Sequence, residues 1–307
     1  MSTDLESPRS QALRYISASH FHRLFKHGDL TTSYADIGVP SDTTILFMPG
    51  MFASRYLAVS MHAVAESLGV RVLIVDRPGM GASTPVPLEK RVSVWIDLVP
   101  RLLAHLNIPH VALASHSAGM IYLLNTLFHC RELLHPERPR ITSMQMAQFL
   151  PTRVFSIWNQ IPKFLLLTAT PVLESSGTIV NKVSSVSGTA PSGASSAQAE
   201  RNRDRVESEH GLLKEVQKEL EPLTWRFMFE ENTQGANDEA LQCLCKGPAG
   251  SWGICEDYEG GGFEDVVDFE TAVIPGTDHN TVSQEIGLLE RIFLEAGGRW
   301  SAGDNGR

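Results

Sequence analysis

The sequence lacks several features that would assign it to a familiar class of protein. Its 307 residues include only four cysteines, and these form no two CxxC pairs, so neither a disulfide framework nor a complete zinc site is expected. Basic residues number 26 against 35 acidic ones, and the net charge of −9 disfavours nucleic acid or an anionic membrane as a partner. No apolar run approaches the roughly 18 residues of a membrane span.

The N-terminus has no apolar core either. The stretch "MSTDLESPRSQALRY" carries acidic residues early, which is not typical of a secretory signal peptide. We therefore expect a cytoplasmic protein without a membrane span. A reducing compartment would keep the cysteines as free thiols, at Cys130, Cys243, Cys245 and Cys255.

The first half of the chain alternates short apolar runs with stretches of helical spacing. The runs at 43–50, 70–76 and 110–115 are nearly all apolar, as in strands that are buried on both faces of a sheet. Segments with helical spacing separate them, and Gly69 stands where the first of these helices should end. This pattern predicts an α/β fold with a mostly parallel sheet flanked by helices, and residues 1–150 form its N-terminal half.

The character of the sequence changes after residue 150. We interpret 151–245 as a helical lid insertion that contains a Ser/Gly-rich loop at 184–200. A sheet-like pattern returns in "DFETAVIPG", and an apolar helical pattern follows it. Residues 246–307 are therefore predicted to form the C-terminal part of the core.

A candidate nucleophile stands in "VALASHSAGMIYLLNTL", where an apolar strand pattern runs directly into a helical one. Ser117 has small residues two positions away on each side, Ser115 and Gly119, as a nucleophile elbow requires, because bulk there would clash with the neighbouring strand and helix. The alternative is that Ser117 is an ordinary helix N-cap. That role does not explain the small flanking residues, so we favour the nucleophile.

Two further elements of acyl-transfer chemistry can be placed. A serine hydroxyl needs a base, and His279 lies on a loop just after the last apolar strand pattern. The developing oxyanion needs backbone N–H donors, for which the candidates are Ala118, after the serine, and Met51, in the loop after the run at 43–50. Pro49 has no N–H to donate.

The stretch "VDRPGMGASTP" contains a GxG pattern that also occurs in dinucleotide-binding loops. A phosphate-binding loop of that kind opens a helix at once, whereas here "STPVP" follows. We therefore interpret it as a structural turn.

The motifs "MPGM", "DRPGMGAST", "SHSAG" and "PGTDHN", in this order and spacing, resemble those of the α/β-hydrolase fold superfamily. The segments "CKGPAGSWGICEDY" and "VDFETAVIPGTDHNTV" are similar, more narrowly, to a group of fungal α/β-hydrolases. The resemblance covers about residues 35 to 295. It implies a Ser–acid–His hydrolase without a cofactor or metal, with Ser117 as nucleophile, His279 as base, and Met51 and Ala118 as oxyanion donors.

The acid of this triad has no clear candidate. Between Lys246 and Asp268 the sequence offers no apolar strand of the kind that precedes the acid in the resembling proteins, and we interpret this as a deletion. Asp257 and Asp265 are the substitutes we consider. Loss of the acid would impair catalysis without abolishing it.

The sequence therefore predicts a serine hydrolase that cleaves an ester or thioester of a small apolar metabolite. The alternatives are a non-hydrolytic member of the fold, such as a cyclase or lyase of secondary metabolism, and a catalytically impaired relative that binds a ligand. The short region between 246 and 268 is the reason for keeping the impaired relative open.

Overall fold

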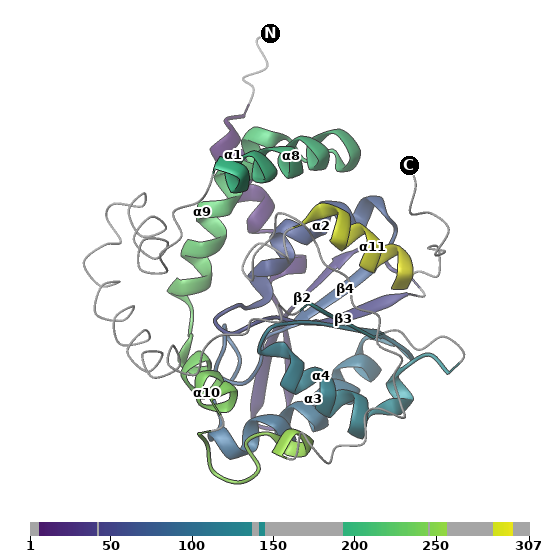
Figure 1. Ribbon diagram of the computed structural model, residues 1–307, viewed down its shortest axis with the longest axis vertical. Coiled ribbons are helices and arrows are strands. Elements are labelled where there is room, and N and C mark those ends of the chain that lie inside the picture. Colours follow the sequence, from purple (N-terminus) through teal and green to yellow (C-terminus); the bar gives the residue numbers. More distant parts are fainter. Residues whose placement is uncertain are drawn as a thin grey trace, which may run out of the picture.

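The computed structural model describes residues 6–41, 43–136, 141–144, 193–244, 246–256 and 285–296 (Figure 1). A six-stranded sheet lies at its centre, with the strands in the order β1-β2-β4-β3-β5-β6. The strands are β1 Arg23–His27, β2 Leu30–Gly38, β3 Thr44–Met48, β4 Arg71–Val75, β5 Ala112–His116 and β6 Ile141–Met144.

The sheet is antiparallel at one side and parallel at the other. β1 pairs antiparallel with β2, and β2 antiparallel with β4. The remaining neighbours, β4 with β3, β3 with β5 and β5 with β6, are all parallel. The predicted mostly parallel sheet is confirmed for these four strands, whose carboxyl ends therefore lie along one edge.

Helices cover both faces of the sheet (Figure 1). The view shows α2 and α11 on one side of it and α3 and α4 on the other. The described α-helices are α1 Pro8–Ile16, α2 Ala58–Ser67, α3 Arg91–His105, α4 Gly119–His129, α8 Gly193–His210, α9 Lys214–Glu230, α10 Gln234–Cys243 and α11 Ile286–Ala296. Short 3-10 helices occur at η1 Ser19–Phe21, η2 Arg55–Leu57, η3 Leu88–Lys90, η4 Arg131–Leu133 and η5 Gly253–Glu256.

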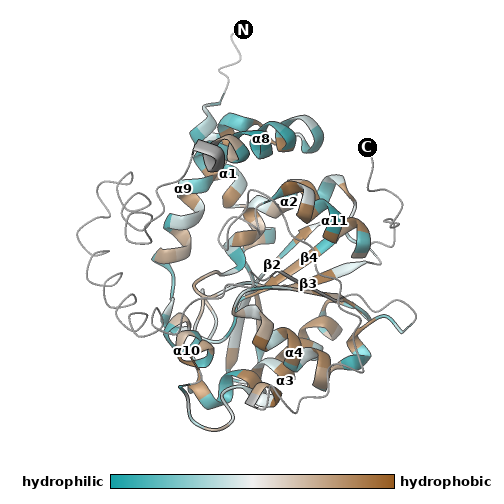
Figure 2. Cartoon of the chain, viewed as in Figure 1, coloured by the Kyte–Doolittle hydropathy of each residue, from teal (hydrophilic) through white to brown (hydrophobic). Residues whose placement is uncertain are grey.

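The apolar strands divide their side chains between two cores. In β4, Val72 and Ile74 pack into the core shared with α2, α9 and α11, while Leu73 and Val75 pack into the core shared with α3 and α4. This alternation follows from the two-residue period of a strand. Figure 2 shows helices α2, α3 and α4 as largely hydrophobic where they cover the sheet. A strand with no polar face, as predicted, is thus buried on both sides.

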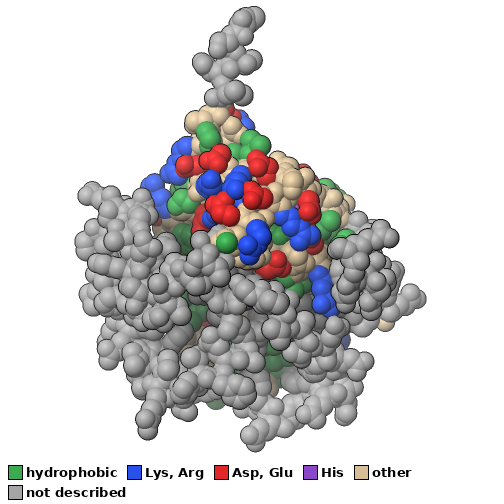
Figure 3. Space-filling model, turned by 45° about the horizontal axis from the view of Figure 1, so that its top comes forward, with side chains coloured by type: hydrophobic (Ala, Val, Ile, Leu, Met, Phe, Trp, Pro, Cys, Tyr) green, Lys and Arg blue, Asp and Glu red, His purple; other side chains and the backbone are tan. Residues whose placement is uncertain are grey.

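One sequence expectation is wrong in its extent. The predicted Ser/Gly-rich loop at 184–200 overlaps α8, which begins at Gly193 and continues to His210. Alanine, glutamate and arginine favour the helix, and Arg203 pairs with Glu200 one turn away and with Glu221 of α9. Figure 3 shows acidic and basic side chains intermixed on this face of the molecule. α3 continues through Pro100.

The glycine predicted to end the helix after β3 does so. α2 ends at Ser67, and Gly69 adopts φ 64°, a left-handed conformation that favours glycine. Among the described helices, none combines the length and the hydropathy needed to cross a lipid bilayer.

Candidate active site

Ser117 lies on a strained turn at the carboxyl end of β5. Its φ is 52°, in the left-handed region that a non-glycine residue rarely adopts, at a cost of about 1–2 kcal/mol. α4 begins two residues later, at Gly119, and its N-cap residue is Ala118 rather than Ser117. A strained strand-to-helix turn of this kind is the local geometry of a nucleophile elbow.

The small residues beside Ser117 are required by close packing. A Cβ added to Gly119 would overlap the backbone oxygen of Met48 at the end of β3. Ser115 is fully buried and lies opposite Met48 in the parallel register of β3 and β5. The predicted need for a small residue is therefore confirmed at Gly119 by the lack of space for a Cβ, and Ser115 lies at a fully buried position.

The loop that follows β3 approaches the same turn. A Cβ added to Gly50 would lie 2.9 Å from Nδ1 of His116 and 3.2 Å from Cβ of Ser117. Met51 comes next and is partly exposed, and Phe52 has a φ of 66°, a second strained non-glycine residue. The loop that carries the predicted donor Met51 thus lies beside Ser117, and its strained backbone must be held by its surroundings.

Arg77, just after β4, donates hydrogen bonds to the backbone of the loop that carries Met51. Its Nη1 donates to the Pro49 oxygen at 2.6 Å, and its Nη2 donates to the Gly50 oxygen at 2.9 Å and to the Ala53 oxygen at 3.4 Å. The Arg77 side chain is fully buried. A buried guanidinium needs acceptors for its five N–H groups, and the loop carbonyls supply several of them.

The charge of Arg77 is balanced by Glu239 of α10. Glu239 accepts from Nε and, at 2.9 Å, from Nη2 of Arg77, and it accepts from Nη2 of Arg91 at 2.9 Å. Tyr122 of α4 accepts from Nε of Arg91 at 3.2 Å. Burial alone would lower the pKa of Arg77, but the neighbouring Glu239 carboxylate outweighs it and raises that pKa. We name these four residues the Arg77 cluster.

A second set of ion pairs lies beside it. Arg55 of η2 donates to Asp76 at 2.8 Å and makes two bonds of 2.6 Å to the carboxylate of Glu231, which follows α9. Ser33 of β2 also donates to Asp76 at 2.6 Å. Burial raises the pKa of Asp76, which is fully buried. We name Arg55, Asp76 and Glu231 the Arg55 cluster.

The remaining predicted site residues lie outside the described part of the chain. These are the base His279 and the two candidate acids, Asp257 and Asp265. Of the predicted site residues, the structure brings Ser117, Ala118 and the Met51 loop together at one edge of the sheet, and the roles assigned to all of them stay predictions.

Arg77 and Glu239 were not among the site residues predicted from the sequence. A signal was available for Arg77, because "VLIVDR" places two charges directly at the end of a buried strand, where each needs a partner. Its loop "DRPGMG" was interpreted as a structural turn, and Gly79 and Gly81 do adopt φ values of 76° and 56°. No comparable signal existed for Glu239, because its partner lies 162 positions away.

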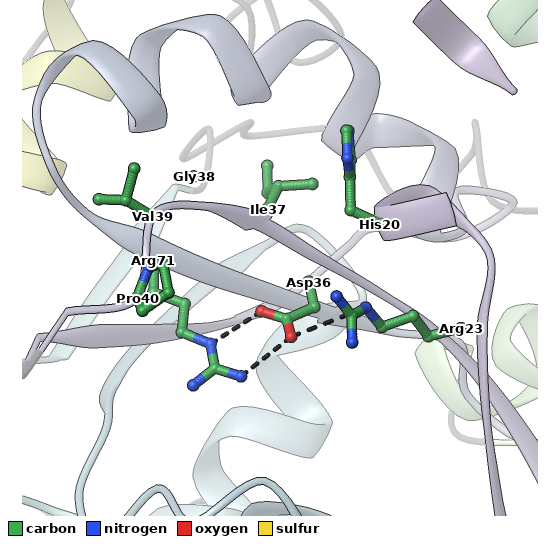
Figure 4. A pocket seen from close by; sticks show the side chains of 8 residues that line it. All are labelled: His20, Arg23, Asp36, Ile37, Gly38, Val39, Pro40 and Arg71. Carbon is green, nitrogen blue, oxygen red and sulfur yellow. Dashed lines mark hydrogen bonds and ion pairs between the residues drawn. The ribbon is translucent and has the colours of Figure 1, made fainter. Parts of the chain in front are cut away.

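Two other groups of polar residues lie apart from Ser117. A hollow of about 300 Å³ lies between Arg71 and His20, where Arg71 and Arg23 flank Asp36 (Figure 4). It lies at the start of β4, and therefore at the sheet edge opposite to Ser117. Glu209, His210 and Glu290 could together approach a metal ion, but Arg205 already pairs with both glutamates.

Comparisons with known proteins give likenesses in structure alone. No protein-family model and no curated protein matches the chain. An α/β-hydrolase fold protein from Chitinophaga pinensis is 14% identical, with a TM-score of 0.38 over 48% of this chain and 52% of that one. A hydrolase from Pseudomonas aeruginosa PA01 is 15% identical, with a TM-score of 0.40 over 71% of each chain. The epoxide hydrolase VrEH1 from Vigna radiata is 18% identical, with a TM-score of 0.34 over 46% of this chain and 43% of that one.

The match spans about half the length of the first of these structures and less than half of the third. The fold is evident in the topology of the described strands. The strand order, the antiparallel β2 and the strained serine turn between β5 and α4 together define the α/β-hydrolase fold. The described part of this chain has that fold.

Proposed function

We propose that the protein is a serine hydrolase that cleaves an ester or thioester of a small apolar molecule. The observation that carries this proposal is the backbone of Ser117, whose φ of 52° places it on a strained turn between β5 and α4. Such strain costs free energy and persists where the surrounding structure enforces it, which is common at active sites. The close approach of the Met51 loop to this turn supports the same function.

The proposed reaction proceeds through an acyl-enzyme. Oγ of Ser117 attacks the substrate carbonyl while its proton passes to His279, and the carbonyl oxygen becomes an oxyanion held by the N–H groups of Met51 and Ala118. The tetrahedral intermediate then expels the alcohol or thiol, which takes the proton from the imidazole. Water, activated by the same imidazole, attacks the acyl group and releases the acid and free Ser117.

The apolar character of the proposed substrate is supported by the helices that follow the sheet. On α9, Trp225 and Phe229 stack with ring centroids 6.0 Å apart, and they are 41% and 50% exposed. Large apolar side chains exposed together are typical of surfaces that contact apolar ligands or partners. We propose that these helices belong to a lid over the site, in keeping with the predicted insertion.

A fluorophosphonate probe tests the nucleophile. We expect covalent labelling of the purified protein, and we expect its loss in Ser117→Ala and a strong decrease in His279→Ala. Ser60→Ala is the matched control, because Ser60 is an exposed serine of α2 and its variant should label like the parent. Labelling that persists in Ser117→Ala would disprove the assignment.

A second candidate function is a ligand-binding relative with an impaired triad. The short sequence between 246 and 268 favours it, because the usual acid is not evident there. In that case the folded parent would resist the probe, whereas a small apolar ester would still raise its melting temperature. The same purified protein therefore distinguishes the two functions.

A further inference from the structure

The peptide bond between Gly50 and Met51 joins the Arg77 cluster to the turn at Ser117. Its carbonyl oxygen accepts from Nη2 of Arg77 at 2.9 Å, and the preceding carbonyl, of Pro49, accepts from Nη1 at 2.6 Å. All described peptide bonds are trans, and in a planar trans peptide the C=O and N–H bonds point in opposite directions. When Arg77 fixes the Gly50 oxygen, it therefore also fixes the direction of the Met51 N–H.

The orientation of Arg77 depends in turn on Glu239. The two carboxylate oxygens of Glu239 accept from Nε and Nη2 of Arg77, which together form one edge of the planar guanidinium. This two-point contact sets the plane of the guanidinium, so that Nη1 and Nη2 are directed at the loop. Both side chains are essentially fully buried, so water cannot replace either partner.

α10 is packed closely enough to transmit this position. The Gly235 N–H donates to the Gly79 oxygen at 2.9 Å, and a Cβ added to Gly235 would lie 2.7 Å from the Pro78 oxygen. The start of α10 thus lies directly on the loop that follows β4. Glu239 comes one turn of helix further on and is held against Arg77 by this contact.

We propose that Glu239 is a positioning residue for the oxyanion hole. It acts through Arg77 and the Gly50–Met51 peptide on the direction of the Met51 N–H, and this inference rests on the proposed function of Met51 as an oxyanion donor. Glu239, in the chain beyond residue 150, would thereby influence the reaction through the direction of the Met51 N–H, in addition to any role that this part of the chain has in covering the site.

The test compares Glu239→Gln with Glu231→Gln. Both variants remove the charge of one glutamate that pairs with arginine, but Glu231 accepts from Arg55 and Tyr56 and, in the described part of the chain, makes no hydrogen bond to residues 48–54. The readouts are the rate of fluorophosphonate labelling at Ser117, kcat and KM for p-nitrophenyl butyrate, and hydrogen exchange of the 48–54 segment, where the Ala53 N–H donates to the Gly50 oxygen.

For Glu239→Gln we expect labelling about 10- to 100-fold slower, a fall in kcat with little change in KM, and faster exchange of the 48–54 segment. Glu231→Gln should stay close to the parent in all three readouts. Equal labelling rates and unchanged exchange in both variants would overturn the proposal. A purely structural role would alter the folded fraction without separating kcat from KM.

Failure of the proposed function gives a different result. If the parent does not label at all, Ser117 is not a working nucleophile. Hydrogen exchange of the 48–54 segment then tests the positioning role of Glu239 by itself. Faster exchange of 48–54 confined to Glu239→Gln would support the positioning role, and unchanged exchange would refute it.

A second variant covers the case in which Glu239→Gln does not fold. Arg77→Lys keeps the charge opposite Glu239 but replaces the planar fork with one ammonium on a flexible stem. It cannot hold Glu239 and two loop carbonyls in the same geometry. We expect a folded protein with the same slower labelling and faster loop exchange, and parent-like values would count against the proposal.

Discussion

The Arg77 and Arg55 clusters lie at the end of the same strand, yet they serve different parts of the molecule. Each joins the residues just after β4 to the helices beyond residue 193. In the Arg55 cluster the acceptors are mainly carboxylates, and the Glu231 side chain is 27% exposed. In the Arg77 cluster the Glu239 side chain is 1% exposed, and three of the acceptors of Arg77 are backbone carbonyls of the loop beside Ser117.

This difference shows what complete burial does to an ion pair. A partly exposed pair can exchange protein partners for water, so it tolerates change and contributes modestly. A fully buried guanidinium must find every acceptor in the protein, and the nearest ones here are the carbonyls of the Met51 loop. The requirement to satisfy Arg77 therefore also shapes the candidate active site.

The largest expected effect is on the free energy of unfolding, which we expect to fall further in Glu239→Gln than in Glu231→Gln. Glu239→Gln leaves Arg77 buried without its carboxylate partner and Arg91 with only the longer pair to Asp238, and we expect the free energy of unfolding to fall by about 3–5 kcal/mol. Glu231→Gln leaves Arg55 paired with Asp76, so the loss should be about 1 kcal/mol or less. Urea denaturation of both variants measures the difference, and equal losses would contradict the comparison.

A glycine substitution can disturb the Arg55 cluster alone. A Cβ added to Gly81 would overlap a carboxylate oxygen of Asp76 and lie 2.7 Å from Nη1 of Arg55, and the φ of 56° is unfavourable for alanine. We expect Gly81→Ala to lower the free energy of unfolding by about 2–4 kcal/mol. Its rate of probe labelling per folded molecule should stay near that of the parent, and a large decrease would show that the Arg55 cluster also serves the site.

We expect low pH to destabilise the protein through His20, which lies next to the Arg55 cluster. Burial, together with the nearby charge of His62, lowers the pKa of His20 to about 4 from 6.5. Between these values the unfolded chain binds more protons than the folded one, so stability is lost as the pH falls through this window. The backbone carbonyl oxygen of Phe21, the residue after His20, accepts from Nε of Arg55 at 3.0 Å.

We therefore expect His20→Gln to show a smaller drop in melting temperature between pH 6.5 and pH 4 than the parent does. A differential scanning measurement at the two pH values tests this. An identical drop in parent and variant would mean that other groups cause the acid sensitivity.

The smallest expected effect concerns the residue between the two clusters. Ser54 follows Ala53, whose carbonyl accepts from Arg77, and precedes Arg55, whose N–H donates to Asp76 at 2.5 Å. The Ser54 hydroxyl is buried and has no hydrogen-bond partner in the described structure. Ser54→Ala should leave stability unchanged or raise it by about 1 kcal/mol, as thermal melting can show. A clear loss would reveal a partner for this hydroxyl.

The sequence predicted the parts of the fold that depend on local pattern. The apolar runs at 43–50 and 70–76 contain β3 and β4, and the run at 110–115 covers β5 up to its last residue, because strands buried on both faces have few polar positions. The turn at Ser117 was predicted from its small neighbours, since close packing of strand and helix leaves no room for bulk there.

The parts that failed depend on contacts distant in sequence or on context. The Ser/Gly-rich composition near residue 193 suggested a loop, but the packing of α8 against α9 and its ion pairs made it a helix. Arg77 and Glu239 are far apart in the chain, so no local pattern links them. The base His279 and the acids Asp257 and Asp265 stay predictions, because they lie outside the described residues.

The adjacent pair Asp76 and Arg77 has a consequence for the accuracy of folding. Successive residues of an extended chain face opposite sides, so Asp76 meets Arg55 in one layer and Arg77 meets Tyr122 and Glu239 in the other. A slip of β4 by one residue would place each charge in the layer of like charge, with a carboxylate toward Glu239 and a guanidinium toward Arg55. These two opposite charges therefore disfavour any alignment of β4 that is shifted by one residue.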